Sequence, residues 1–472
     1  MTPVAKNTEH TVTIESVTAK GYGVGFINGF TIFVEGALPG DVLQIYVLKA
    51  KARYGYGKII NILTPSLHRQ ESLCPVFDRC GGCQWQNAAY NAQLAYKKKI
   101  VIDVLERIGG IPSPPVQDVL HMKNPYNYRN KAVFPIVPSN NVHGFAVGMF
   151  SARSHRIVEV ENCNIQHPAH VQVLKIVKKF MRRNKITAYD ETTHRGLMRF
   201  VMVRTSLSSN EVMVVLTVNG NGIPLENRLA EDLASAGVTT VVISRHTTKT
   251  NVVLGQHFRT ISGSGFISER IGHVTYKVSA PSFFQVNPVQ TKTLYEIAVT
   301  QAKLKGKTVM DAHVGAGGVS LFAARYAKSI LGVDIVAAAT EDGQKNASLN
   351  GITNLEFVCG AAEDVLPPML TGPNAAPPDV MFLDPPRKGC EPALLEAIIC
   401  AQIPRVVYIS CDPATLARDI KLLCAGGYEL LEAQPVDMFP HTGKVEVSCL
   451  LTAQDQREQF TTERTGSAHV TT

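Results

Sequence analysis

The chain has 472 residues, too many for one ordinary domain, and its 45% hydrophobic and 18% charged residues are typical of globular domains with substantial cores. No basic-then-apolar signal pattern and no run of 18 apolar residues occurs, which argues against secretion and a membrane span, so we expect a cytoplasmic protein. Ten unevenly spaced cysteines indicate thiols, cluster ligands or nucleophiles and argue against a disulfide framework.

The net charge of +8 is unevenly distributed along the chain. Residues 1–208 hold 26 Lys and Arg against 13 Asp and Glu, a net charge of +13, whereas residues 209–472 hold 21 against 26, a net charge of −5. A basic front half on a mildly acidic back half indicates that the front half binds a polyanion such as a nucleic acid. The alternative is a solvated basic surface without a partner.

Residues 1–66 are predicted to form a small β-barrel. Between residues 11 and 63, alternating Val, Ile and Phe are interrupted by Gly-rich turns, which favours about five short strands. Small barrels of this OB-like type bind single-stranded nucleic acid through a basic, aromatic face. Alternatively, the aromatic side chains only pack on the barrel surface. The residues that would supply such a face gather on one predicted loop: Lys49, Lys51, Arg53, Tyr54 and Tyr56.

Residues 67–280 are predicted to form a central α+β domain. A helical pattern over residues 88–110 ends at a Gly-Gly pair, and a second, strongly basic helix is expected over residues 171–186. Apolar runs rich in Val predict strands after it, over residues 199–207, 211–219 and 239–247.

A cysteine cluster lies in the first part of this domain. Cys74, Cys80 and Cys83 have the spacing C-x5-C-x2-C, and Cys163 stands alone as a distant fourth candidate ligand. Four thiolates can hold either zinc or a 4Fe-4S cluster, and the spacing alone does not decide between them. A resident cluster would pin the loop-rich segment to the region near Cys163, and a redox-sensing role is the alternative.

Residues 281–452 alternate strand and helix patterns and predict a parallel, doubly wound, Rossmann-like sheet. The remaining residues, 453–472, are polar, and we expect them to be disordered.

The first strand of this domain is followed by a Gly-rich turn, His-Val-Gly-Ala-Gly-Gly, at residues 313–318. Such a turn lets a cofactor approach the backbone closely. Asp334 ends the next strand, where a carboxylate can accept hydrogen bonds from ribose hydroxyls. Acidic residues at 363 and 364 follow the third strand, where an adenine edge would lie. The dinucleotide fingerprint is incomplete and no phosphate-gripping loop is present, so S-adenosylmethionine fits better than a dinucleotide.

Two further motifs follow predicted neighbouring strands. Asp384 begins an Asp-Pro-Pro-Arg sequence, whose prolines restrict the backbone that carries the carboxylate. Cys411 ends the next strand, just before a helix start at Asp412-Pro413. Ligands of open parallel sheets bind at these carboxyl ends, and a helix N-terminus favours the reactive thiolate. The alternatives are a structural Asp and a small buried Cys.

Taken with these motifs, the chain resembles the RNA uracil-5 methyltransferase family. The resemblance rests on the segments at residues 283–287, 384–390, 410–419 and 441–451 and extends to the front of the chain, where the barrel looks like a TRAM domain and residues 128–134 also match. A branch of this family carries a 4Fe-4S cluster with this cysteine pattern. The resemblance therefore implies that Cys74, Cys80, Cys83 and Cys163 ligate such a cluster.

The resemblance also implies roles for individual residues. Cys411 would attack carbon 6 of uracil, which makes carbon 5 nucleophilic, and Glu446 would later remove the carbon 5 proton. The residues implied to bind S-adenosylmethionine or line its pocket are Gln285, His313, Asp334 and Asp384. Two positions depart from the family: His313 replaces the usual Tyr or Phe, and Gly318 replaces a frequent Asn. These departures put individual cofactor contacts in doubt and leave the reaction untouched.

We expect a monomeric enzyme without an obligate protein partner, acting on 23S ribosomal RNA, because the family members with both a TRAM domain and a cluster act there. Transfer RNA is the second candidate substrate. Another class is a catalytically idle RNA-binding protein of the same fold, against which the intact Cys411 and Glu446 argue. A radical enzyme would need an open iron site with three ligands, whereas four candidate ligands are present.

Overall fold

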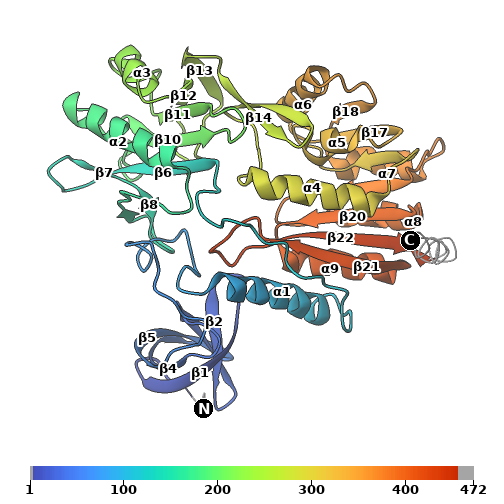
Figure 1. The fold of residues 1–472 in the computed structure, drawn as a ribbon, viewed down its shortest axis with the longest axis horizontal. Helices are drawn as coiled ribbons and strands as arrows, with labels where there is room; N and C mark the ends of the chain where they lie inside the picture. The colour runs from blue at the N-terminus through green and yellow to red at the C-terminus, as the bar shows by residue number, and fades with distance from the viewer. Residues whose placement is uncertain (1–3, 455–472) are drawn as a thin grey trace, which may run out of the picture.

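The computed structural model describes residues 4–454, which form a β-barrel, a central mixed sheet and a C-terminal sheet (Figure 1). The predicted disordered tail therefore lies, from residue 455 on, outside the described residues. Within residues 4–454 no helix is long and apolar enough to cross a membrane.

The predicted barrel is confirmed as a closed five-stranded barrel in the order β1-β2-β3-β5-β4. Its inward-facing side chains alternate with outward-facing ones, so a compact apolar core fills the interior, with Ile32, Val34 and Ile45 fully buried. The strands are β1 (Glu9–Val17), β2 (Tyr22–Ile27), β3 (Phe30–Glu35), β4 (Val42–Ala50) and β5 (Tyr54–Thr64).

The central sheet has six strands in the order β13-β12-β11-β10-β6-β7. Helices α2 (Pro168–Arg183) and α3 (Glu226–Ala234) share one apolar core with it. The opposite face shares a core with the hairpin β14–β15 and with the C-terminal sheet. The strands are β6 (Lys131–Pro138), β7 (Phe145–Val147), β10 (Met198–Thr205), β11 (Val212–Val218), β12 (Thr240–Arg245), β13 (His257–Ser262), β14 (Phe266–Ile271) and β15 (Val274–Ser279), with a separate pair β8 (Met149–Phe150) and β9 (Ile157–Val158).

The C-terminal sheet has seven strands in the order β18-β17-β16-β19-β20-β22-β21. The first five are parallel, as predicted, and β22 is antiparallel to both of its neighbours. The strands are β16 (Thr308–Asp311), β17 (Ser329–Asp334), β18 (Leu355–Cys359), β19 (Val380–Leu383), β20 (Arg405–Ser410), β21 (Tyr428–Val436) and β22 (Glu446–Ala453).

Helices cover both faces of the C-terminal sheet because its strands are apolar on both sides. In β20, Val407 and Ile409 face the core shared with α4 and α5, whereas Val406 and Tyr408 face the core shared with α1 and α7 to α9. The helices are α1 (Tyr90–Arg107), α4 (Pro288–Ala302), α5 (Gly318–Ala323), α6 (Ala337–Leu349), α7 (Ala362–Thr371), α8 (Pro392–Cys400) and α9 (Pro413–Ala425).

Segments that precede residue 281 also take part in this C-terminal core. The hairpin β14–β15 packs with α4 and α5, and α1 packs between the barrel and α9 (Figure 1). The domain boundaries at residues 66, 280 and 452 stay predictions.

Candidate active site

The predicted nucleophile and base lie opposite each other on neighbouring strands. Cys411 directly follows β20, and Glu446 begins β22. Because Ser410 pairs with Val447 in this antiparallel ladder, the next pair in register is Cys411 with Glu446. Asp384 directly follows β19, the other neighbour of β20, so three chemically active side chains gather at one end of three adjacent strands.

Local structure fixes the position of Cys411. Asp412 caps α9 by accepting hydrogen bonds from the backbone N–H groups of Ala414 (3.0 Å) and Thr415 (3.3 Å), and Pro413 occupies the first turn. The backbone therefore turns sharply from strand to helix at the thiol, which is partly exposed and reduced.

The helix N-terminus is expected to favour the thiolate of Cys411, whereas burial and neighbouring carboxylates act in the opposite direction. Burial raises the pKa of the thiol to about 11, and the charges of Glu446 and Asp384 act in the same direction. A hydrogen bond and the charge of Arg387 oppose them but are outweighed. Burial and the two carboxylates therefore favour the thiol form of Cys411 at neutral pH.

Glu446 is 3% exposed, and burial raises its pKa well above the ordinary value. Asp384 raises it further, whereas Arg387 and Lys444 lower it. Burial also raises the pKa of Asp384 to about 7, assisted by the charge of Asp311. Buried carboxylates of this kind are stronger bases than exposed ones, which suits a group that must take a proton near neutral pH.

The Gly-rich turn lies between β16 and α5, at the same end of the sheet. Gly315 has φ +55°, and nothing lies within 4 Å of where a Cβ would stand. Its N–H donates to Asp334 Oδ2 at 3.0 Å, and the N–H of Val336 donates to Oδ1 at 2.8 Å. An open backbone beside a strand-end carboxylate fits the ribose and adenine of a nucleotide-type cofactor.

Apolar and polar groups next to this turn add to the fit. Ile335 and Val336, directly after Asp334, are 70% and 53% exposed, as an adenine contact surface would be in a protein without ligand. His313 holds a buried Nδ1 without a hydrogen-bond partner, and burial lowers its pKa to about 4, so it is neutral.

Gln285 lies in the segment that leads into α4, and its carbonyl accepts a hydrogen bond from Asn130 Nδ2 at 3.0 Å. The two neighbouring aromatic residues differ: Phe284 packs edge-on against Tyr276 at 5.5 Å, whereas Phe283 is 73% exposed. Of the two aromatic rings, Phe283 is therefore available to stack on a nucleic-acid base.

Arg387 and Lys444 are the site residues without a predicted role. Arg387 belongs to the Asp-Pro-Pro-Arg motif, which marked its position, but its contact with Cys411 depends on the fold. Lys444 lies two residues before Glu446, and burial together with the charges of Arg387 and Arg129 lowers its pKa. No spacing in the sequence pointed to it.

The four predicted cluster ligands converge only loosely. The charges of Cys163, Cys80 and Cys74 each raise the pKa of Cys83, which burial already raises to about 12. N–H donors point at two of the sulfurs, from Gly82 to Cys80 (3.4 Å) and from Gln86 to Cys83 (3.3 Å). Even so, no three His, Cys, Asp or Glu side chains within residues 4–454 are grouped closely enough to hold a metal ion.

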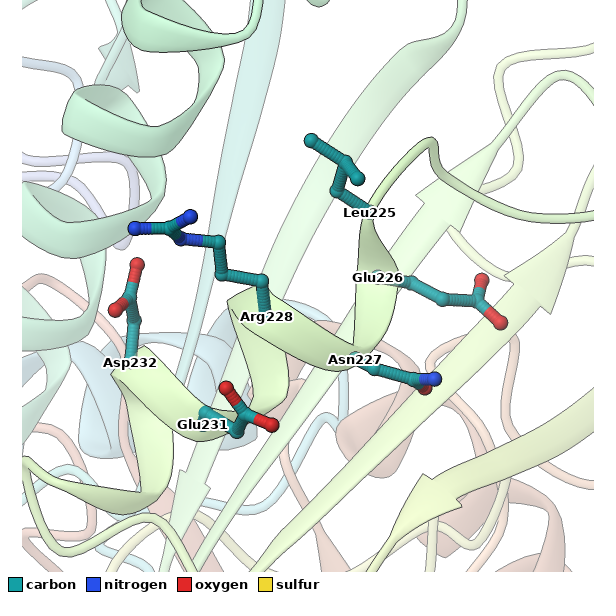
Figure 2. A pocket seen from close by; sticks show the side chains of 6 residues that line it. All are labelled: Leu225, Glu226, Asn227, Arg228, Glu231 and Asp232. Carbon is teal, nitrogen blue, oxygen red and sulfur yellow. The ribbon is translucent and has the colours of Figure 1, made fainter.

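A surface hollow of about 540 Å³ lies elsewhere, along α3. Figure 2 shows that all its lining side chains come from one segment, residues 225–232. None of the predicted site residues contributes to it, so its position carries no information on the chemistry.

The fold and the site together define an RNA methyltransferase, and comparisons with known proteins agree. The family model for the TRAM domain matches residues 3–60, and the model described as tRNA (Uracil-5-)-methyltransferase matches residues 89–372 and 374–454. The chain belongs to this uracil-5 methyltransferase family.

Relatives and a solved structure extend over nearly the whole chain. A protein of Halalkalibacterium halodurans named an uncharacterized RNA methyltransferase is 44% identical, covering 95% of this chain and 98% of its own. One of Clostridium tetani is 41% identical, with 95% and 97% covered. The crystal structure of Pyrococcus abyssi tRNA (uracil-54, C5)-methyltransferase with S-adenosyl-L-homocysteine has a TM-score of 0.75 at 25% identity, covering 94% of this chain and 99% of its own.

Proposed function

We propose that the protein methylates carbon 5 of a specific uridine in 23S ribosomal RNA, with S-adenosylmethionine as the methyl donor. One observation supports this proposal above all: Cys411 lies between Asp384 and Glu446 at the ends of three adjacent strands. A thiol beside a buried base is the arrangement that addition to uracil, followed by proton removal, requires.

The proposed sequence begins with attack of the Cys411 sulfur on carbon 6 of the uracil, which leaves an enolate with a nucleophilic carbon 5. The thiol proton must leave before or during this attack, and Asp384, whose pKa is raised to about 7, is the proposed acceptor. S-adenosylmethionine supplies the methyl group. Glu446 then takes the proton from carbon 5, and the sulfur leaves carbon 6.

The proposed cofactor residues are Asp334 for the ribose hydroxyls and Gln285, His313 and Asp384 around the remainder of the molecule. The open backbone at Gly315 and the unpartnered Nδ1 of His313 support this assignment. We also propose that one chain suffices, because Cys411, Glu446 and Asp384 all belong to one sheet.

A 4Fe-4S cluster held by Cys74, Cys80, Cys83 and Cys163 is part of the proposal. The mutual electrostatic effect of the four thiols and the N–H donors aimed at two sulfurs support it, since metal-bound thiolates accept such hydrogen bonds. The backbone N–H groups of Gln84 and Trp85 also donate to the carbonyl of His441, at 3.0 Å each, so this segment braces the loop before Glu446. The proposed role is therefore structural.

Transfer RNA is the second candidate substrate, because the solved relative of Pyrococcus abyssi is named for a tRNA uridine. Mass-spectrometric mapping of 5-methyluridine in both RNA classes from cells without the gene decides between them. Loss of a mark in 23S ribosomal RNA supports the proposal, loss in transfer RNA supports the second candidate, and loss of neither contradicts both.

Complementation tests the nucleophile in the same cells. Wild-type protein should restore the lost mark, and Cys411→Ala should not. The matched control is Cys424→Ala, at a partly buried thiol on α9 away from the site, which should restore the mark.

A further inference from the structure

Three cations lie together where the central sheet meets the C-terminal sheet. Lys131, the first residue of β6, and Arg204 in β10 are direct partners in an antiparallel ladder, and Arg129 lies two residues before Lys131. Like charges in directly opposite positions destabilise a sheet. No carboxylate of residues 4–454 forms an ion pair with any of the three.

Part of the hydrogen-bonding capacity of the two arginines is also unused. Arg204 is 2% exposed; its Nη2 donates to the carbonyl of Ser282 at 2.8 Å, but its Nε and Nη1 are buried without a partner. Nε of Arg129 is buried without a partner as well. Burial lowers the pKa of Arg204 to about 10, and burial with the charges of Arg204 and Arg129 lowers that of Lys131 to about 8. Such unpaired buried donors are costly and indicate a binding site.

The cluster adjoins the proposed active site on two sides. Asn130, between Arg129 and Lys131, donates its N–H to the carbonyl of Val286 at 2.9 Å, which places the cluster against the segment that carries Phe283 and Gln285. On the other side, the charge of Arg129 lowers the pKa of Lys444, and the charges of Cys411 and Glu446 raise the same pKa. Lys444 therefore lies between the cluster and the proposed active site.

We propose that Arg129, Lys131 and Arg204 form a phosphate site that grips the RNA backbone next to the target uridine. The inference rests on the proposed function. Guanidinium groups present paired donors that match phosphate oxygens, and a buried cation cluster without acids is complementary to an anion. An enzyme that takes a base out of its stack must hold the backbone on which the base turns. A backbone phosphate next to the nucleophile is the anion that this reaction brings to the cluster.

Lys131→Met tests the phosphate site, because Met keeps the length of the side chain and removes its charge. The matched control is Lys175→Met, an exposed lysine on α2. Binding of an oligouridylate is measured over a series of KCl concentrations. The slope of log affinity against log salt should fall by about one in Lys131→Met and stay unchanged in the control.

Thermal unfolding without RNA gives an independent readout. Lys131→Met should melt at a higher temperature than the wild type, because it relieves repulsion from Arg204. Inorganic phosphate, compared with chloride at equal ionic strength, should raise the melting temperature of the wild type and of Lys175→Met more than that of Lys131→Met.

An unchanged salt slope in Lys131→Met overturns the phosphate site. So does a raised KM for S-adenosylmethionine with an unchanged slope, which would assign the cations to the methyl donor's carboxylate. Arg204→Met is the second variant, and Lys131→Met decides alone if Arg204→Met does not fold. A failure of the proposed function looks different, since the wild-type protein would then methylate no uridine in either RNA class.

Discussion

The protonation state of Cys411 has a measurable consequence. Because burial beside Glu446 and Asp384 raises its pKa to about 11, the thiolate fraction should rise about tenfold per pH unit below that value. Alkylation of Cys411 by iodoacetamide, followed by mass spectrometry of its peptide, should speed up accordingly from neutral pH to about pH 10. In Arg387→Met the profile should shift to higher pH, since Arg387 lowers this pKa. A wild-type rate that levels off near neutral pH would contradict the dominance of burial.

Glu446→Gln should separate the two halves of the proposed reaction. Attack by Cys411 and methylation need no base at position 446, whereas release of the product does, so a covalent protein–RNA species should accumulate on denaturing gels. Turnover should fall by at least about a hundredfold. The double variant Cys411→Ser with Glu446→Gln is the control and should form no such species. Wild-type turnover in Glu446→Gln would remove Glu446 from the mechanism.

The sequence predicted where the reactive residues lie better than how they titrate. Asp384 and Cys411 follow successive strands, and parallel strands end at one edge, so their proximity followed from the pattern alone. Glu446 came only from the family resemblance, because nothing in its strand distinguishes it. The pKa of Cys411 depends on carboxylates 27 and 35 positions away in the chain, and such distances carry no local signal.

At the scale of elements, α1 is joined to the segment before Glu446 by a buried ion pair. Lys97 and Asp437 contact each other with both side chains fully buried, and Tyr90 Oη also donates to Asp437 Oδ2 at 2.7 Å. Breaking such a pair from one side leaves an uncompensated charge. We therefore expect Lys97→Met to lower the free energy of unfolding by about 3–5 kcal/mol in urea titrations.

The partner variant separates charge burial from packing in this pair. Adding Asp437→Asn to Lys97→Met removes the uncompensated negative charge of Asp437 and should restore part of the lost stability. Lys98→Met is the matched control, since the Asp118 partner of Lys98 is 94% exposed and such pairs contribute at most about 1 kcal/mol. Equal losses for Lys97→Met and Lys98→Met would contradict the role of the buried pair.

Helices were harder to predict than strands. The barrel strands and the parallel strands have clear apolar patterns, and α1, α2, α6 and α8 have recognisable ends. The short helix α3 and the helices α4 and α7 went unpredicted. α4 contacts α5, β14, β20 and β22 on different sides, so its buried residues, among them Gln290 and Thr291, follow no single apolar stripe.

At the scale of the whole molecule, the barrel carries a cluster of aromatic rings away from the active site. Tyr22, Phe33, Tyr54 and Tyr56 form a chain of ring contacts with centroids 5.6–5.9 Å apart, and Lys51 lies over the ring of Tyr54 at 5.3 Å. Tyr54 and Tyr56 thus belong to a larger ring cluster than the sequence indicated, because strand pairing brings in rings from β2 and β3. The prediction that the basic and aromatic residues share one loop is wrong, since Lys49 lies in β4 and both tyrosines lie in β5.

Tyr54→Ala should weaken binding of an oligouridylate by about 1–3 kcal/mol if a base stacks on this face. Tyr46→Ala, on β4 outside the ring cluster, is the matched control. Fluorescence anisotropy at fixed salt measures both variants. Equal affinities for Tyr54→Ala and the wild type would mean that the rings only pack on the barrel, the alternative that the sequence left open.

Residues 437–446 are held by contacts with α1 and with the segment before β2. These contacts also affect when the enzyme becomes active during its synthesis. Tyr90 and Gln93 contact Asp437 and His441 across 347 and 348 residues of chain, and a Cβ on Gly443 would meet the carbonyl of Ala19 at 2.5 Å. Contacts of such long sequence separation form late in folding. On a translating ribosome, the barrel and α1 emerge early but must wait for the final strand. The segment that leads into Glu446 is therefore held in place only after nearly the whole chain has been synthesised.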